Sequence, residues 1–192
     1  MRVLVWIVEG TWEGCIAAAR AACPETAEVT LLHVSSADVT AVSGGAFAGL
    51  LGRGRGGERD PGRRVQLLSE QAAQQLLADA RDLFDRPAQL RSRTGRVERE
   101  VVAAADGMDV LVLARDGDRS RLGPHSLGPD SRFVVDHAPC TVVLAWPDQV
   151  PSVSAIPPPP GKERPPHQDH LPPPGPPRGP GPPHHLGPPP PR

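Results

Sequence analysis

The fold is decided by residues Asp109–Trp146, DVLVLARDGDRSRLGPHSLGPDSRFVVDHAPCTVVLAW. The first part, Asp109–Ala114, and the last part, Thr141–Trp146, are short apolar runs typical of strands that are covered on both faces. Between them Gly128-Pro129 begins a helix, because proline is favoured at the first helical position, and Pro139 ends it. A helix between two such strands predicts a right-handed crossover in a parallel sheet.

The rest of the chain continues this alternation of strands and helices. Apolar runs predict strands at Arg2–Val8, Val29–Val34 and Ala88–Arg93, and the weak pattern of the last one indicates an edge strand. Helical periodicity predicts helices at Trp12–Ala22, Val65–Phe84 and Val97–Ala105. We therefore expect an α/β fold, an open five-stranded parallel sheet with helices on both faces.

Individual residues refine the predicted helices. Thr11 is expected to be the N-cap of the first helix, and Gly107 the C′ residue of the helix before Asp109. In the long helix, apolar residues at i+3 and i+4 spacing predict one buried row, made of Leu68, Ala72, Leu76, Ala80 and Leu83.

Composition excludes several classes of protein. A formal net charge of −1 gives no surface for nucleic acid or for a membrane. Val3–Val8 is too short for the core of a signal peptide, and no apolar run approaches the ~20 residues that span a bilayer, so we expect a cytoplasmic protein. Cys15, Cys23 and Cys140 lack metal-ligand spacing and are interpreted as small buried side chains, with a redox pair of the first two as the alternative.

Three regions are expected along the chain. Residues 1–148 form the α/β domain, interrupted by a long Gly- and Arg-rich loop at 35–64, interpreted as a linker or as an anion contact. Residues 149–192 hold most of the 26 prolines and are expected to be a disordered tail. Within it, Pro173–Arg178 fits a polyproline ligand pattern, so a polyproline-binding partner is one alternative to a plain spacer, and weak metal binding by the tail histidines is another.

Topology predicts where a ligand would bind. In open α/β sheets, ligands lie at the carboxyl ends of the strands where the strand order reverses. The two most apolar strands, Arg2–Val8 and Asp109–Ala114, are expected to be central neighbours. Their following segments, Glu9–Thr11 and Ala114–Gly128, therefore line the expected crevice.

Several short motifs resemble the universal stress protein family over about residues 1–148. They are Val8-Glu9-Gly10-Thr11 after the first strand, Leu31-Leu32-His33-Val34 in the second, Asp109–Leu113, and His137-Ala138-Pro139-Cys140 before the last strand. The resemblance implies a sheet of strand order 3-2-1-4-5, as in adenine-nucleotide alpha hydrolase-like folds. It also implies a homodimer, and the last strand, Thr141-Val142-Val143-Leu144, is an apolar edge expected to form its interface.

Many family members bind ATP through the motif G-x2-G-x9-G-[ST] after the fourth strand. Counted back from His137–Cys140, its positions fall on Arg115, Asp118, Gly128 and Pro129, so one of the four is retained. The resemblance implies a candidate nucleotide site of Glu9, Gly10, Thr11, Val34, Ala114, Arg115, Asp118, Gly128 and Pro129. Because glycines expose the N–H groups that bind phosphate and Pro129 has none, we expect that ATP is not bound in the usual manner.

No catalytic or metal site is predicted. His125, His137, Ser126 and Ser131 do not form a nucleophile motif, His33 is interpreted as a hydrogen-bonded strand residue, and His137 as the cation of a helix C-terminus. The preferred interpretation is a non-catalytic regulatory or stress-response protein. Two alternatives stay open: a sensor of ATP or AMP that uses Glu9, the 114–128 loop and the 53–64 arginines, and a dimeric scaffold with a polyproline tail.

Overall fold

The computed structural model describes residues 1–36 and 61–156. These residues belong to one compact unit, Met1–Pro157. Its strands are β1 (Arg2–Trp6), β2 (Glu28–Ser36), β3 (Ala88–Gly95), β4 (Val110–Ala114) and β5 (Thr141–Ala145). Its helices are α1 (Trp12–Ala22), α3 (Pro61–Phe84), α4 (Val97–Ala105) and α5 (Pro129–His137), with short 3-10 turns η1 (Pro124–Ser126) and η2 (Val153–Ala155).

The strands form one parallel sheet of order β3-β2-β1-β4-β5, which confirms the predicted fold. The central strand β1 pairs with β2 on one side, Val3 opposite Val29, and with β4 on the other, Val3 opposite Val110. The strand order therefore reverses between β1 and β4. The crevice expected from topology lies beyond the carboxyl ends of these two strands.

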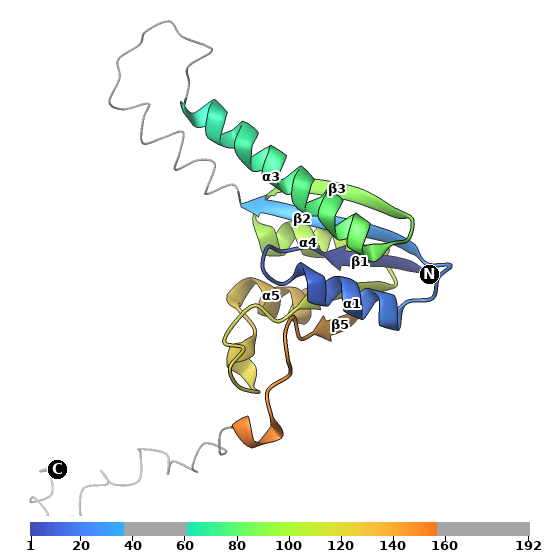
Figure 1. The fold of residues 1–192 in the computed structure, drawn as a ribbon, viewed down its shortest axis with the longest axis vertical. Coiled ribbons are helices and arrows are strands. Elements are labelled where there is room, and N and C mark those ends of the chain that lie inside the picture. The colour runs from blue at the N-terminus through green and yellow to red at the C-terminus, as the bar shows by residue number, and fades with distance from the viewer. Residues whose placement is uncertain (37–60, 157–192) are drawn as a thin grey trace, which may run out of the picture. The chain divides into compact units, whose positions relative to one another are not determined.

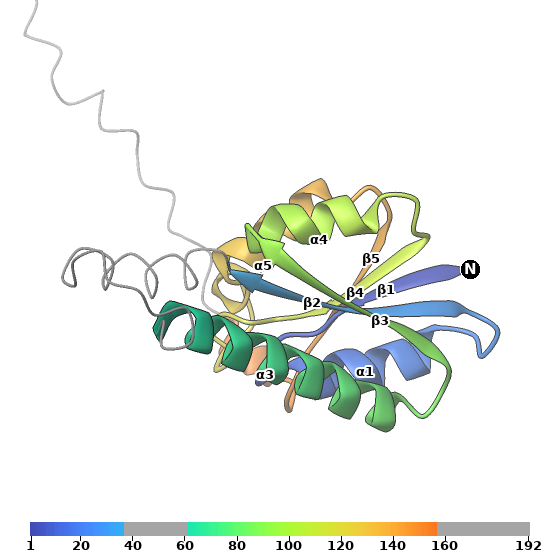
Figure 2. The same ribbon diagram turned by 90° about the horizontal axis from the view of Figure 1, so that it is seen from above.

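Helices cover both faces of the sheet. Figure 2 shows α1 and α3 on one face and α4 and α5 on the other. The first layer packs around Val5, Ile16 and Phe84, and the second around Leu4, Val101 and Leu113, all of which are fully buried or nearly so. The alternation of β1 side chains explains the division, since successive residues point to opposite faces.

The structure corrects the bounds of several predicted strands. β1 ends at Trp6 and β5 at Ala145, so Val8 and Trp146 lie beyond the strands that were expected to include them. β2 and β3 are longer than expected and run side by side to their ends, where Ser36 lies opposite Gly95. The backbone pairing between the two strands explains this extension, which side-chain periodicity does not report.

The long helix α3 differs most from its prediction. It begins at Pro61, so residues 61–64 belong to it and not to the preceding loop. Its buried row is Ala73, Leu77, Ala80 and Phe84, and of the predicted row only Ala80 is fully buried, whereas Leu68 is 57% exposed. Two apolar rows lie side by side on this helix, and periodicity alone selected the wrong one. Figure 1 shows that the start of α3 extends past the sheet, so the residues there have no sheet to cover them.

Helix ends are partly as predicted. Gly107 has φ +71, as a C′ residue requires, and Pro129 is the first residue of α5. Thr11 is at the N-cap of α1 but makes no side-chain cap, because its hydroxyl donates to the Val8 carbonyl instead.

Parts of the predicted loop and tail lie outside the described residues, namely 37–60 and 157–192. The arginines at 53–59, the polyproline pattern and the tail histidines are among them. Of the predicted tail, residues 149–156 are described and include the single turn η2. No helix in the described part is long and apolar enough to cross a membrane.

Candidate functional site

The turn after β1 forms one wall of the crevice. Gly10 has φ +76, a backbone conformation that favours glycine, and the Thr11 N–H donates to the Val8 carbonyl at 3.2 Å. Glu9 is exposed, whereas Thr11 is 8% exposed. Of the three predicted residues in this turn, Glu9 is therefore the one whose side chain faces solvent with a free charge.

The loop after β4 closes on itself through its backbone. The Gly117 N–H donates to the Ser126 carbonyl at 3.0 Å, and the Asp118 N–H donates to the His125 carbonyl at 2.8 Å. A Cβ atom on Gly117 would lie 2.3 Å from the His125 oxygen, so this close approach requires glycine. Two N–H groups of the loop are thus bonded within it and do not point towards a ligand.

The N-terminus of α5 is capped by a carboxylate from the same loop. Asp116 Oδ1 accepts a hydrogen bond from the Gly128 N–H at 2.8 Å, and a Cβ on Gly128 would lie 2.9 Å from Asp116 Oδ2. Helix N-termini bind anions because their N–H groups are unpaired and the helix dipole is positive there. Here the chain supplies the anion itself, and the next residue, Pro129, has no N–H to offer.

A second carboxylate in the crevice is also satisfied internally. Asp118 accepts hydrogen bonds from the backbone and hydroxyl of Ser120 and from Arg121 Nε at 3.0 Å. The bonds from Ser120, and then the Arg121 charge, hold the pKa of Asp118 below its usual value. This residue is therefore a charged anchor of the loop at neutral pH.

Negative charge gathers beside the start of α5. Burial raises the pKa of Asp130, and the nearby carboxylates of Glu98 and Asp116 raise it further, against the opposing charge of Arg96. Phosphate groups placed here would meet the same repulsion.

The loop arginines are engaged with the protein. The Arg115 guanidinium donates to the Ser126 hydroxyl and lies over the Trp146 ring, 4.9 Å from its centroid. Arg119 forms an ion pair with Asp148 at 2.8 Å and donates to the Gly10 carbonyl at 3.4 Å, which ties the loop to the β1 turn. These contacts bring two predicted parts of the site together and occupy the Arg119 guanidinium. Arg115 Nε, in contrast, is buried without a hydrogen-bond partner.

A cavity of about 420 Å³ lies beside Glu9. The described residues lining it come from the β1 turn, β2 and α3: Glu9, His33, Ser69, Ala72, Ala73, Gln75, Leu76 and Asp79. His33 Nδ1 lies 3.0 Å from the Ile7 carbonyl, so this nitrogen carries the proton and donates it. The prediction of a hydrogen-bonded strand histidine is confirmed.

The predicted site residues thus divide into three groups. Glu9 faces the cavity; Gly10, Arg115, Asp118, Gly128 and Pro129 belong to the closed loop or its contacts; Thr11, Val34 and Ala114 are 8%, 6% and 6% exposed. Because the side chains of Thr11, Val34 and Ala114 are buried, a ligand could contact little of these residues except their backbone atoms.

The other candidate residues, which are serine, histidine and cysteine side chains, are packed or hydrogen-bonded within the fold. Ser126 is 1% exposed and its hydroxyl donates to the Gly123 carbonyl at 2.6 Å. His137, the last residue of α5, stacks on Phe133 with ring centroids 4.0 Å apart. All three cysteines are free thiols, and burial, followed by the charge of Glu13, raises the pKa of Cys15 to about 12. Within the described ranges, no group of three or more His, Cys, Asp or Glu side chains has the arrangement of a metal site.

Sequence reasoning missed Asp116, the residue that decides the state of the loop. Its partner Gly128 is twelve residues away, so the pair fits no local capping pattern. The signal present in the sequence was an acidic residue two positions after the end of a strand and twelve residues before a Gly-Pro helix start.

Comparison with known proteins gives structural neighbours only. No protein-family model and no curated protein matches the chain. The structure is similar to that of hypothetical protein MJ0577, with a TM-score of 0.55 and 17% identity, covering 76% of this chain and 94% of that one. It is similar to a universal stress protein in complex with cAMP, with a TM-score of 0.52, 14% identity and coverage of 77% and 98%. It is also similar to hypothetical protein PH0823, with a TM-score of 0.51, 19% identity and coverage of 76% and 94%.

At these identities the likeness is one of fold, and it covers nearly the whole of each neighbour. The strand order, the crossover through α5 and the motifs at both ends of Asp109–Trp146 agree with it. The chain has the fold of the universal stress proteins.

Proposed function

We propose that this protein is a non-catalytic, universal-stress-type regulatory or stress-response protein that does not bind ATP in the manner usual for that family. The observation that carries the proposal is the 2.8 Å hydrogen bond from the Gly128 N–H to Asp116 Oδ1. A carboxylate of the chain stands where a phosphate would accept that hydrogen bond. A nucleotide phosphate would have to displace the Asp116 carboxylate and break its hydrogen bond with the Gly128 N–H.

Isothermal titration of the purified chain with ATP-Mg tests this proposal. We expect no binding at micromolar concentrations, because the N–H groups of Gly117, Asp118 and Gly128 already have acceptors. Micromolar affinity that is lost on Glu9→Ala or Gly128→Ala would contradict it.

A matched pair of variants identifies the cause. Asp116→Ala removes the carboxylate that caps α5, whereas Asp118→Ala removes a carboxylate of the same loop that bonds to Ser120 and Arg121. If Asp116 excludes the nucleotide, only the first variant gains affinity for ATP. If neither variant gains affinity for ATP, the weak binding of ATP is due to the residues at the other motif positions.

A second candidate function is an adenine-nucleotide sensor. The cavity beside Glu9 favours it, because a carboxylate and the His33 ring face a volume of about 420 Å³ at the carboxyl end of β1. One structural neighbour is described as a complex with cAMP. Mass spectrometry of small molecules released from freshly purified, denatured protein separates the two functions, since the sensor would release ATP or AMP.

A homodimer through β5 is part of the proposal. β5 is the last strand of the sheet, and Val142, Val143 and Leu144 are partly exposed along it. An unpaired apolar edge favours pairing with a second strand. Sedimentation equilibrium is expected to give a dimer, and a monomer at micromolar concentration would contradict this assembly.

A further inference from the structure

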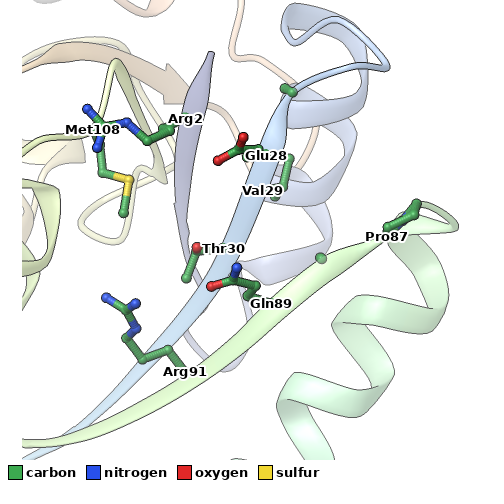
Figure 3. A pocket seen from close by; sticks show the side chains of 10 residues that line it. Arg2, Glu28, Val29, Thr30, Pro87, Gln89, Arg91 and Met108 are labelled. Atoms are coloured by element: carbon green, nitrogen blue, oxygen red, sulfur yellow. The ribbon is translucent and has the colours of Figure 1, made fainter.

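A second cavity lies at the opposite end of the sheet from the candidate site. It has a volume of about 440 Å³ and is lined by the amino-terminal parts of β1, β2 and β3 together with Met108, which precedes β4. Figure 3 shows its lining, with the side chains of Thr30 and Gln89 near each other and the guanidinium groups of Arg2 and Arg91 on either side of Met108. This volume suits a small molecule.

Strand register brings the polar lining together. Arg2 lies opposite Glu28, and Thr30 lies opposite Gln89, so residues far apart in the sequence share one face of the sheet. Further along β2 the same face carries Leu32 and Val34, which are buried under α4. The polar residues therefore begin where the apolar packing of this face ends.

The polar side chains of this cavity lack partners within the protein. Among residues 1–36 and 61–156, no hydrogen bond or ion pair is formed by the side chains of Arg2, Glu28, Thr30, Gln89 or Arg91. Thr30 is only 6% exposed and lines the cavity. The two guanidinium groups outnumber the single carboxylate of Glu28 among the residues that line the cavity, so the lining has an excess of positive charge.

We propose that this amino-end cavity binds a small organic anion, a carboxylate or a phosphate ester. Arg2 and Arg91 supply the positive charge, and the Thr30 hydroxyl and Gln89 amide donate hydrogen bonds to the anionic oxygens. Ala27, Pro87 and Met108 line the cavity with apolar surface for the carbon part of the molecule. Glu28 at the same site limits the affinity for an anion, because its carboxylate repels the ligand. The proposal is independent of nucleotide binding at the carboxyl end.

NMR titration of the full chain with succinate, and separately with inorganic phosphate, tests this inference at constant ionic strength held with chloride. We expect saturable shifts of the Gln89 side-chain amide and the Thr30 backbone amide with at least one of the two anions. The anion that saturates at the lower concentration identifies the carboxylate or the phosphate class.

Variants decide whether the shifts come from this cavity. Arg91→Met and Thr30→Val are expected to abolish saturation, whereas Arg64→Met, which removes the same charge from the exposed start of α3, leaves it unchanged. Glu28→Gln is expected to raise the affinity about fivefold by removing one repulsive charge. Absence of saturable shifts with both anions, or equal effects of Arg91→Met and Arg64→Met, would overturn the proposal.

Discussion

At the carboxyl end of the sheet, the charged side chains of the 115–128 loop have hydrogen-bond partners, whereas the charged side chains that line the amino-end cavity have none among the described residues. Asp116, Asp118 and Arg115 each have a partner inside the 115–128 loop. Arg2 and Arg91, about one strand length away, have none among the described residues. At the carboxyl end, the start of α5 is bonded to the protein's own Asp116, while the cavity beside Glu9 stays open. At the amino end, the open cavity is lined by polar side chains without partners among the described residues.

The usual binding position of a fold is therefore not by itself a binding site. The helix N-terminus of α5 is present, as the fold requires, and its dipole still favours an anion. In this protein the anion at the start of α5 is the Asp116 carboxylate. Because Asp116 belongs to the same chain, its effective concentration at this position is high. A free phosphate must compete with it.

The largest expected effect concerns the thiols at the two ends. Cys15 lies in α1 near the carboxyl end, and burial raises its pKa from 9.0 to about 12, so its thiolate fraction falls about a thousandfold. Cys140, at the amino end of β5, is half-buried, and its pKa is also raised, by burial and then by the Asp109 charge, but without the full burial of Cys15. Iodoacetamide at pH 8, followed by peptide mass spectrometry, is expected to label Cys140 in the folded protein and Cys15 only after unfolding. Comparable labelling rates would show that the carboxyl end is open.

The next effect is on the closure of the loop. Gly117→Ala is expected to lower the free energy of unfolding by about 2–3 kcal/mol, because its Cβ would lie 2.3 Å from the His125 oxygen. Gly10→Ala is the control: it has open space but φ +76, and it should cost about 1 kcal/mol. Urea denaturation measures both, and equal costs would mean that the loop does not close as described.

A smaller effect compares one carboxylate from each end. Asp116→Ala is expected to cost about 1 kcal/mol, as the loss of a helix cap does. Glu28→Gln is expected to change stability by less than about 0.5 kcal/mol, since its carboxylate has no partner among the described residues. Thermal unfolding of both variants checks the difference, and a greater loss for Glu28→Gln would reverse the comparison.

The smallest effect is on the titration of Asp130. Its raised pKa means that the folded state holds the proton more tightly, so this group lowers stability as pH rises through the window between its ordinary and its folded pKa. Asp116→Ala removes one of the charges that raise this pKa and should bring it closer to the ordinary value. NMR titration of the Asp130 carboxyl measures the shift. Asp118→Ala is the control, and an equal shift in it would indicate a general change in charge.

Much of the fold could be predicted because it depends on local patterns. The strand order followed from the resemblance, and the helices Trp12–Ala22 and Val97–Ala105 have the bounds that periodicity predicts. The buried row of α3 was wrong because two apolar rows lie one residue apart on that helix, and only the position of the sheet selects between Leu76 and Leu77. Residue types alone carry no information on that choice.

The two segments that were expected to line the crevice lie next to each other, but the hydrogen bonds within the second one were not predicted. The turn at Glu9 and the loop after β4 do meet, through Arg119 and Gly10, as the crossing of strand ends requires. That the loop is bonded to itself was not predictable, since the partners of Gly117 and Gly128 are nine and twelve residues away and have no fixed spacing.

Residue types at short range were enough to predict the alternation of elements and the parallel sheet, and to show that the loop after the fourth strand departs from the G-x2-G-x9-G-[ST] pattern. Which side chains become hydrogen-bond partners depends instead on contacts between residues far apart in the sequence. Asp116 caps α5, and Arg2, Thr30 and Arg91 share a cavity, because strand register and loop closure bring distant residues together. Those distances are set by the packing of the whole sheet, which no local pattern in the chain encodes.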